Sequence, residues 1–157
     1  MRAVLIGAGS VAVATARQLL AHGHEVVIIE RDKDRIDALM GDLDCGYIHG
    51  DGSRPAILRE AGPEHSDLLF CLTGSDQANI IASLVGRSLG FRRVVTKIDD
   101  PAFEHICIEL GLDGTIIPAR TIGQHLADMA EGQEPPELST MNREEARGLV
   151  SLFRNPP

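Results

Sequence analysis

The stretch R-A-V-L-I-G-A-G-S-V-A at residues 2–12 decides the fold of this chain. Its first part is mostly apolar and ends at a glycine, which predicts a buried strand over residues 2–6. Small and apolar residues then recur at helical spacing, so a helix is expected over residues 10–22. Between the two, residues 7–12 fit G-x-G-x-x-A, an accepted form of the dinucleotide-binding fingerprint that joins a strand to a helix. The sequence therefore predicts a nucleotide-binding α/β fold.

Each small residue of this turn has a separate physical role. Gly7 permits the tight turn, and Gly9 has no β-carbon, so a pyrophosphate can approach the backbone there. Ala12 is small enough for the helix to pack closely on the strand. The N–H groups around Ser10 and Val11 are expected to face the phosphate, with the helix dipole behind them.

The rest of the chain continues the alternation of strands and helices. Apolar or β-branched runs predict strands at 2–6, 25–29, 46–49, 67–73, 93–98 and 114–117. Amphipathic segments predict helices at 10–22, 32–41, 54–61, 76–89, 101–110 and 119–130. Two of these helices have an expected inward face, formed by Ile80, Ile81, Leu84 and Val85 in one and by Phe103, Ile106, Cys107 and Leu110 in the other. We expect a Rossmann-like, doubly wound, six-stranded parallel sheet in the order 3-2-1-4-5-6, with helices on both faces.

The length of 157 residues suits a single domain with a short tail. The predicted nucleotide-binding domain covers residues 1–130. Two prolines and a glycine without periodicity predict a linker at 131–141, and residues 142–153 predict a C-terminal helix. A dehydrogenase of this fold normally has a second domain for its substrate, and this length leaves no room for one. We therefore expect a sensing domain rather than an enzyme.

Composition excludes several classes of function. A net charge of −8 would repel a phosphate backbone, and four phenylalanines with one tyrosine provide no base-stacking platform, so nucleic-acid binding is excluded. No apolar run reaches the roughly 18 residues of a membrane span, so direct membrane insertion is not expected. Three cysteines without a C-x-x-C spacing favour neither a disulfide framework nor a zinc site, and they indicate the reduced cytoplasm.

Glu30 is the acidic residue expected in such a fold, at the end of the second strand and 23 positions after Gly7. A carboxylate there can accept both hydroxyls of an adenosine ribose and would repel a 2′-phosphate, which favours NAD over NADP. Arg31 and Arg35 weaken this preference, because an adjacent arginine can hold a 2′-phosphate. The alternative interpretation is a surface glutamate at a strand end.

Polar residues also follow the third, fourth and fifth strands. Asp51, with Gly52 and Ser53, would sit at the rim of the same crevice and accept from an adenine amino group, or else form a tight turn with its own backbone. Thr73 ends the fourth strand beside the phosphate crevice, where its hydroxyl is expected to donate to a ribose or a phosphate. Asp76 is expected to cap the next helix. Lys97 either reaches a distal phosphate or extends to solvent.

The whole of residues 2–130 resembles the N-terminal nucleotide-binding domain of potassium-conductance regulators, the RCK or KTN domain of TrkA-N type. Besides G-A-G-S-V-A, the resemblance rests on several segments in the same order. They are V-V-I-I-E-R-D-K-D-R at 26–35, H-G-D-G-S at 49–53, L-R-E-A-G at 58–62, D-L-L-F-C-L-T-G-S-D-Q-A-N at 67–79, I-D-D-P-A-F at 98–103 and L-G-L-D-G-T-I-I-P at 110–118.

This resemblance implies a regulatory function without catalysis. Such domains bind NAD(H) or ATP, ADP or AMP, and binding controls a potassium uptake channel or a cation antiporter. The resemblance also implies a cytoplasmic homo-oligomer, a dimer or larger, whose partner is a membrane-embedded potassium transporter or channel subunit. Helix 119–130 corresponds to the crossover and dimer region of the family. The positions matching nucleotide contacts are Gly7, Gly9, Glu30, Asp51, Thr73 and Lys97.

Two other classes of function have weaker signals. A small NAD-dependent oxidoreductase, or the nucleotide-binding module of a larger enzyme, needs a proton donor near the nicotinamide. Tyr47 has no lysine four residues later, and the candidate histidines qualify by residue type alone: His49, His65, His105 and His125. A redox or metal sensor would need clustered ligands, but His22 and His24 do not share a helix face.

Overall fold

The structure, a computed structural model, describes residues 1–132 of the chain and confirms the predicted sheet. Six strands form one sheet in the order β3-β2-β1-β4-β5-β6, and every neighbouring pair is parallel. The strands are β1 (Arg2–Ile6), β2 (Glu25–Glu30), β3 (Gly46–His49), β4 (Leu68–Cys71), β5 (Arg93–Lys97) and β6 (Thr115–Ile116). β1 lies at the centre, and its apolar residues from Ala3 to Leu5 have no exposed surface, as expected for a strand covered on both faces.

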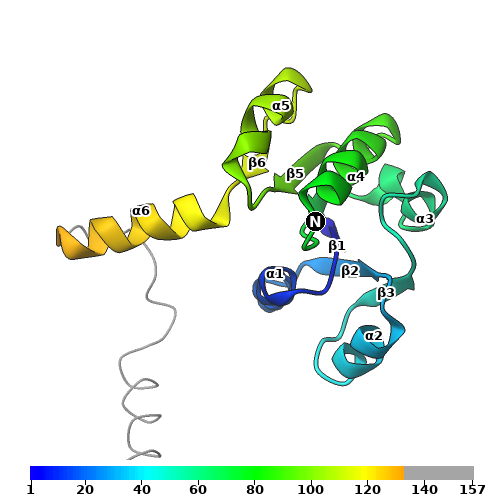
Figure 1. Cartoon of the computed structure of the whole chain (residues 1–157). Coiled ribbons are helices and arrows are strands. Elements are labelled where there is room, and N and C mark those ends of the chain that lie inside the picture. Colours follow the sequence, from blue (N-terminus) through cyan, green and yellow to red (C-terminus); the bar gives the residue numbers. More distant parts are fainter. Residues whose placement is uncertain (133–157) are drawn as a thin grey trace, which may run out of the picture. The chain divides into compact units, whose positions relative to one another are not determined.

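Helices connect the strands and cover both faces of the sheet, as predicted. They are α1 (Ser10–Ala21), α2 (Lys33–Met40), α3 (Pro55–Glu60), α4 (Asp76–Ser88) and α5 (Glu104–Glu109), with short 3₁₀ turns η1 (Pro63–His65) and η2 (Pro101–Phe103). The remaining helix, α6 (Pro118–Ala130), follows the last strand. Figure 1 shows α1 and α2 on one side of the sheet and α3 and α4 on the other. This arrangement follows from right-handed crossovers whose direction reverses between β1 and β4.

The alternation of side chains along β1 and β2 divides the core between the two faces. Ala3 and Leu5 pack with Ala12 and Ala16 of α1, whose small side chains allow a close approach. Val4 and Ile6 face the other way and pack with residues of α3 and α4, among them Leu58 and Ala82. A smaller cluster around Ile98, Cys107 and Leu112 lies under α5.

Three of the predicted inward residues are in fact exposed. In α4, Ile81 is 51% exposed, because the face toward the sheet includes Asn79 and Ser83, two polar side chains that an apolar pattern does not reveal. In the next helical segment, Ile106 and Leu110 are 43% and 38% exposed. The predicted stripe there began at Phe103, which belongs to the 3₁₀ turn η2, so the α-helical spacing does not run through it.

The chain divides into two compact units, Met1–Ala119 and one that begins at Arg120, so the division falls within α6. The domain boundary after residue 130 stays a prediction. The predicted linker, beyond Gly132, and the predicted helix at 142–153 lie outside the described residues. Within residues 1–132, no helix combines the length and apolar character that a membrane span requires.

Candidate functional site

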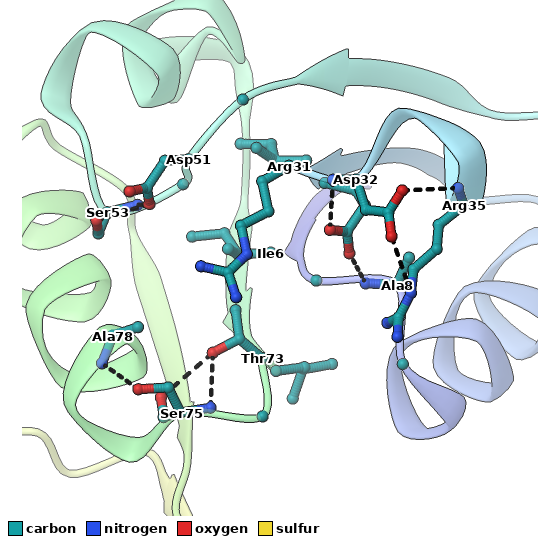
Figure 2. Close-up of a pocket in the computed structure, with 18 residues that line it drawn as sticks. Ile6, Ala8, Arg31, Asp32, Arg35, Asp51, Ser53, Thr73, Ser75 and Ala78 are labelled. Atoms are coloured by element: carbon teal, nitrogen blue, oxygen red, sulfur yellow. Dashed lines mark hydrogen bonds and ion pairs between the residues drawn. The ribbon is translucent and has the colours of Figure 1, made fainter. Parts of the chain in front are cut away.

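A pocket of about 470 Å³ opens at the carboxyl ends of β1, β2, β3 and β4. It is lined by the segments that follow these strands, and Figure 2 shows the Arg31 side chain between Asp51 on one side and Asp32 on the other, with Thr73 below it. The strand order reverses between β1 and β4, and open α/β sheets bind their ligands at such a reversal. All of these segments belong to the unit Met1–Ala119.

The two glycines of the turn after β1 have different surroundings. Gly7 has a φ of +97°, which residues with a side chain rarely adopt, and a β-carbon there would lie 3.1 Å from the Cα of Thr73. The turn therefore packs directly against the chain that follows β4. Gly9 has an ordinary φ of −75°, and a β-carbon there would meet no protein atom within 4 Å. The missing side chain of Gly9 thus leaves room in the pocket that it lines.

Glu30 connects two of the loops that form the pocket. Its Oε2 accepts the N–H of Ala8 at 2.8 Å, and its Oε1 accepts the N–H of Asp32 at 2.9 Å (dashed lines at Ala8 and Asp32 in Figure 2). The residue is 8% exposed and lines the pocket. An ionised carboxylate offers about four lone-pair sites, so Glu30 keeps the capacity to accept further hydrogen bonds from a ligand.

Two arginines bring positive charge to the β2 side of the pocket. Arg31 follows β2, and Figure 2 shows its side chain extending into the pocket. Arg35 lies in the first turn of α2, and its Nε is 3.7 Å from Oδ2 of Asp32. Asp32 also caps α2, because its Oδ1 accepts the N–H groups of Asp34 at 3.0 Å and of Arg35 at 3.4 Å. On the β2 side the charges of Arg31 and Arg35 are thus balanced by those of Glu30 and Asp32.

Asp51 forms a tight turn at the rim of the pocket, so the turn expected as its alternative role is present. Its Oδ1 accepts the hydroxyl of Ser53 at 2.7 Å and the N–H of Ser53 at 2.9 Å. These two bonds hold the pKa of the Asp51 carboxyl below its usual value, and the charges of Arg54 and Arg31 act in the same direction. Asp51 also lines the pocket, and its contact with an adenine amino group stays a prediction.

The two glycines beside Asp51 are enclosed by side chains of the domain itself. A β-carbon at Gly52 would lie 2.4 Å from Cγ2 of Ile6, and one at Gly50 would lie 2.6 Å from Cδ1 of Ile57. A side chain at either position would therefore require the neighbouring isoleucine to shift, whatever binds above them.

Thr73 lines the β4 side of the pocket and is held by Asn79, a residue of α4 with no exposed surface. The N–H of Thr73 donates to Oδ1 of Asn79 at 2.9 Å, and the Thr73 hydroxyl donates to the same oxygen at 2.7 Å. The Asn79 Nδ2 donates to the carbonyl of Thr73 at 3.1 Å and to the carbonyl of Lys97 at 3.0 Å. One buried amide thus ties the end of β4 to the end of β5.

The helix cap predicted at Asp76 is one residue away from its true position. Ser75 caps α4, and its hydroxyl accepts the N–H of Ala78 at 3.3 Å. Asp76 is the first residue of the helix and accepts the N–H groups of Asp99 and Asp100, each at 2.9 Å. Its carboxylate is directed to the loop after β5, because that loop offers two N–H groups with no strand partner.

The structure brings most of the predicted binding residues together in one pocket. Eight of the eleven line it: Gly7, Gly9, Glu30, Arg31, Asp51, Gly52, Ser53 and Thr73. Ser10 and Val11 begin α1 directly after Gly9 but are not among the lining residues. Lys97 does not line the pocket either, and its Nζ is 2.5 Å from Oδ2 of Asp99. Sequence reasoning missed Asn79, although a polar residue one turn before Ser83 on the inward face of a helix was a usable signal.

None of the cysteines and histidines considered for redox or metal chemistry lines this pocket. Burial raises the pKa of the Cys71 thiol to about 12, so this thiol is not reactive in the folded chain. Across residues 1–132, no three His, Cys, Asp or Glu side chains are grouped so as to hold a metal ion. His49 lies next to the pocket, and its Nε2 is 3.0 Å from the carbonyl oxygen of Arg31.

A sequence model of the TrkA-N domain family matches residues 3–118. The Trk system potassium uptake protein TrkA homolog of Archaeoglobus fulgidus is 33% identical over 134 residues, which cover 81% of this chain and 30% of that protein. The homolog of the same name from Methanothermobacter thermautotrophicus is 26% identical over 155 residues, covering 99% of this chain and 72% of that protein. The chain thus spans about a third of the first relative's length.

Solved structures share the fold at low sequence identity. The NAD(P)-binding domain of an exopolyphosphatase-related protein from Archaeoglobus fulgidus has a TM-score of 0.75, with 18% identity over 83% of this chain and 97% of that one. The Kef C-terminal domain of Shewanella denitrificans in its AMP-bound form has a TM-score of 0.72, with 17% identity over 98% and 93%. The GsuK channel bound to NAD has a TM-score of 0.72, with 17% identity over 80% of this chain and 23% of that one.

Proposed function

The chain belongs to the TrkA-N domain family, and from that premise we propose that it is a nucleotide-binding regulatory domain of a potassium transport system. The proposed ligand is NAD(H) or an adenine nucleotide such as ATP, ADP or AMP. The observation that carries the proposal is the position of Gly9 and Glu30 on one pocket at the reversal of strand order.

The residues of the pocket fit an adenine nucleotide. Glu30 has lone pairs left for the two hydroxyls of a ribose while it continues to hold Ala8 and Asp32. Gly9 precedes the first turn of α1, where N–H groups without helical partners and the helix dipole favour phosphate. Arg31 and Arg35 add positive charge on the same side.

The comparisons support the transport part of the proposal through the names of the relatives, which are potassium uptake proteins. The solved structures with NAD and AMP support the class of ligand. We propose that the domain regulates rather than catalyses, that it acts as a homo-oligomer, and that its partner is a membrane-embedded potassium transporter or channel subunit. A nucleotide would act on that partner only by binding two states of the assembly with different affinity.

Titration calorimetry with NADH, NAD, ATP, ADP and AMP tests nucleotide binding by the full chain. The variant Gly9→Ala should weaken binding at least tenfold, because its methyl group occupies the space that phosphates need. Gly41→Ala is the matched control, since a β-carbon at Gly41 also meets no atom within 4 Å and Gly41 does not line the pocket.

The control variant should bind as the unmodified chain does. If the unmodified chain bound none of the five nucleotides, the proposed function would be wrong. If Gly9→Ala and Gly41→Ala bound equally well, the nucleotide would bind at a place other than this pocket.

A further inference from the structure

The orientation of the Asn79 side-chain amide is fixed by backbone groups. The N–H of Thr73 can only donate, so it must face the amide oxygen, at 2.9 Å. The carbonyl oxygens of Thr73 and Lys97 can only accept, so they must face the amide nitrogen, at 3.1 and 3.0 Å. Three independent backbone groups thus agree on which atom is the oxygen, and the buried side chain has no freedom to reverse.

This orientation determines the polarity of the Thr73 hydroxyl. The hydroxyl lies 2.7 Å from Oδ1 of Asn79, and an amide oxygen can only accept, so the single hydroxyl proton is donated to it. The hydroxyl also lies 3.2 Å from the carbonyl oxygen of Ser75, which is likewise an acceptor within the protein. The N–H of Ser75 donates to the hydroxyl at 3.2 Å. Toward the pocket, Thr73 therefore offers one lone pair and no proton.

An acceptor-only hydroxyl distinguishes a phosphate from a sugar. Phosphate oxygens at neutral pH are themselves acceptors, so a phosphate beside Thr73 would place lone pairs against lone pairs. A sugar hydroxyl or an amide N–H can donate to the same position. Within residues 1–132, no cation lines the β4 side of the pocket, because Lys97 is 7% exposed with its Nζ paired to Asp99, and Arg31 and Arg35 enter the pocket from the β2 side.

The pocket assigns different parts of a nucleotide to its two sides. With the adenosine at Glu30 and the phosphates at Gly9, the group that follows the phosphates falls on the β4 side, where Thr73, Gly74, Ser75 and Ala78 line the pocket. In ADP or ATP that group is a terminal phosphate. In a dinucleotide it is a second sugar with hydroxyls that can donate.

We infer that Asn79 is a positioning residue that fixes Thr73 as a hydrogen-bond acceptor, so that the pocket selects a nucleotide whose last phosphate carries a sugar, such as a dinucleotide, over one that ends in a bare phosphate. This inference rests on the proposed nucleotide binding and specifies the ligand class for the same pocket.

The test compares ADP with ADP-ribose, which differ by the sugar on the last phosphate. Calorimetry on the full chain should show at least tenfold tighter binding of ADP-ribose. In Thr73→Val, which has the same shape without the hydroxyl, the ratio of the two affinities should fall about fivefold, the value of one neutral hydrogen bond. Thr73→Ser keeps the hydroxyl and should keep the ratio within about twofold. Arg31 is present in every variant, so a change of ratio reports on residue 73.

Asn79→Leu tests the positioning role. It frees the Thr73 proton, so the preference for ADP-ribose should fall there as well, whereas a purely structural role would weaken both ligands by the same factor. An unchanged ratio in Thr73→Val would overturn the inference, and an unchanged ratio in a folded Asn79→Leu would overturn the part assigned to Asn79.

The remaining outcomes separate this inference from the proposed function. If the unmodified chain bound ADP as tightly as ADP-ribose, the inference would be wrong and the nucleotide-binding function would stand. If it bound neither of them, nor AMP, ATP or NAD(H), both would be wrong.

Discussion

The β2 side and the β4 side of the pocket are each organised around one buried polar side chain, but the two side chains differ in charge. On the β2 side, Glu30 accepts the N–H groups of Ala8 and Asp32. On the β4 side, Asn79 accepts two hydrogen bonds and donates two, to Thr73 and Lys97. Glu30 lines the pocket, whereas Asn79 lies behind it with no exposed surface.

The difference shows how one side chain can hold a loop and still bind a ligand. An ionised carboxylate has about four lone-pair sites, of which Glu30 uses two on its own chain. An amide has two donors and two lone pairs, and Asn79 uses all four. Glu30 can therefore act on a ligand directly, while Asn79 can act only by fixing the atoms of a neighbour. Substitutions of Asn79, Glu30 and Ser53 test how the polar side chains of the pocket hold its loops.

The largest effect is expected for Asn79→Ala, which should lower the free energy of unfolding by about 3 kcal/mol, because it leaves several buried backbone groups without their amide partner. Urea denaturation measures the loss. Ser83→Ala is the matched control on the same helix, since Ser83 is equally buried but its hydroxyl contacts side chains and one helix carbonyl, namely the Asn79 carbonyl, the Thr96 hydroxyl and the Cys71 thiol. It should lose about 1 kcal/mol. Equal losses would mean that Asn79 is an ordinary buried polar residue.

An intermediate effect is expected for Glu30→Gln, which should destabilise the fold by about 2 kcal/mol, because an amide group replaces one carboxylate oxygen and can no longer accept one of the two N–H groups. Glu25→Gln, at the other end of β2, changes a residue whose ion pair with Arg2 leaves its side chain 65% exposed. That control should change stability by no more than about 0.5 kcal/mol in the same urea experiment. If Glu30→Gln were as stable as the control, the two hydrogen bonds of Glu30 to Ala8 and Asp32 would not stabilise the fold.

The smallest effect concerns the pH dependence at Asp51. Its pKa is lowered in the folded chain, so its ionised form favours folding above the ordinary carboxyl pKa of about 4 and loses this contribution as the pH falls through the folded pKa. Ser53→Ala removes the hydroxyl bond and should raise the pKa of Asp51 toward its ordinary value, so the contribution of Asp51 to stability becomes smaller and its loss in acid is complete at a higher pH. An NMR titration of the Asp51 carboxyl measures this, with Ser53→Thr as the control that keeps a hydroxyl. No change in Ser53→Ala would assign the shift to the backbone N–H of Ser53 together with the charges of Arg54 and Arg31.

Patterns of apolar residues and glycines predict much of this fold, because the period of a strand or helix is local. The six strands and their order follow from such runs together with the handedness of crossovers. The predicted strand 46–49 agrees with β3 at both ends. The pattern fails where a buried face contains polar residues, as at Asn79, or where a 3₁₀ turn changes the phase, as at Phe103.

The candidate site could be predicted only in part, because the sequence does not give the direction of each side chain. Residue type and strand position identify Glu30 and Thr73 as pocket residues. They do not reveal that Glu30 binds the N–H of Ala8, or that Lys97 pairs with Asp99, because these partners depend on side-chain direction in the folded chain. A lysine at a strand end can point into the pocket or away from it, and here Lys97 pairs with the carboxylate of Asp99 and does not line the pocket.

The two glycines of the first turn are needed for different reasons, one for folding and the other for ligand binding. Gly7 is demanded by its own φ and by the backbone at Thr73, so a related chain that had lost every ligand would still need glycine there to fold. Gly9 has no such constraint from the protein, and alanine would fit its backbone and its surroundings. The first glycine of the fingerprint is thus a marker of architecture, and the second is the one to inspect when asking whether a chain of this shape still has a ligand.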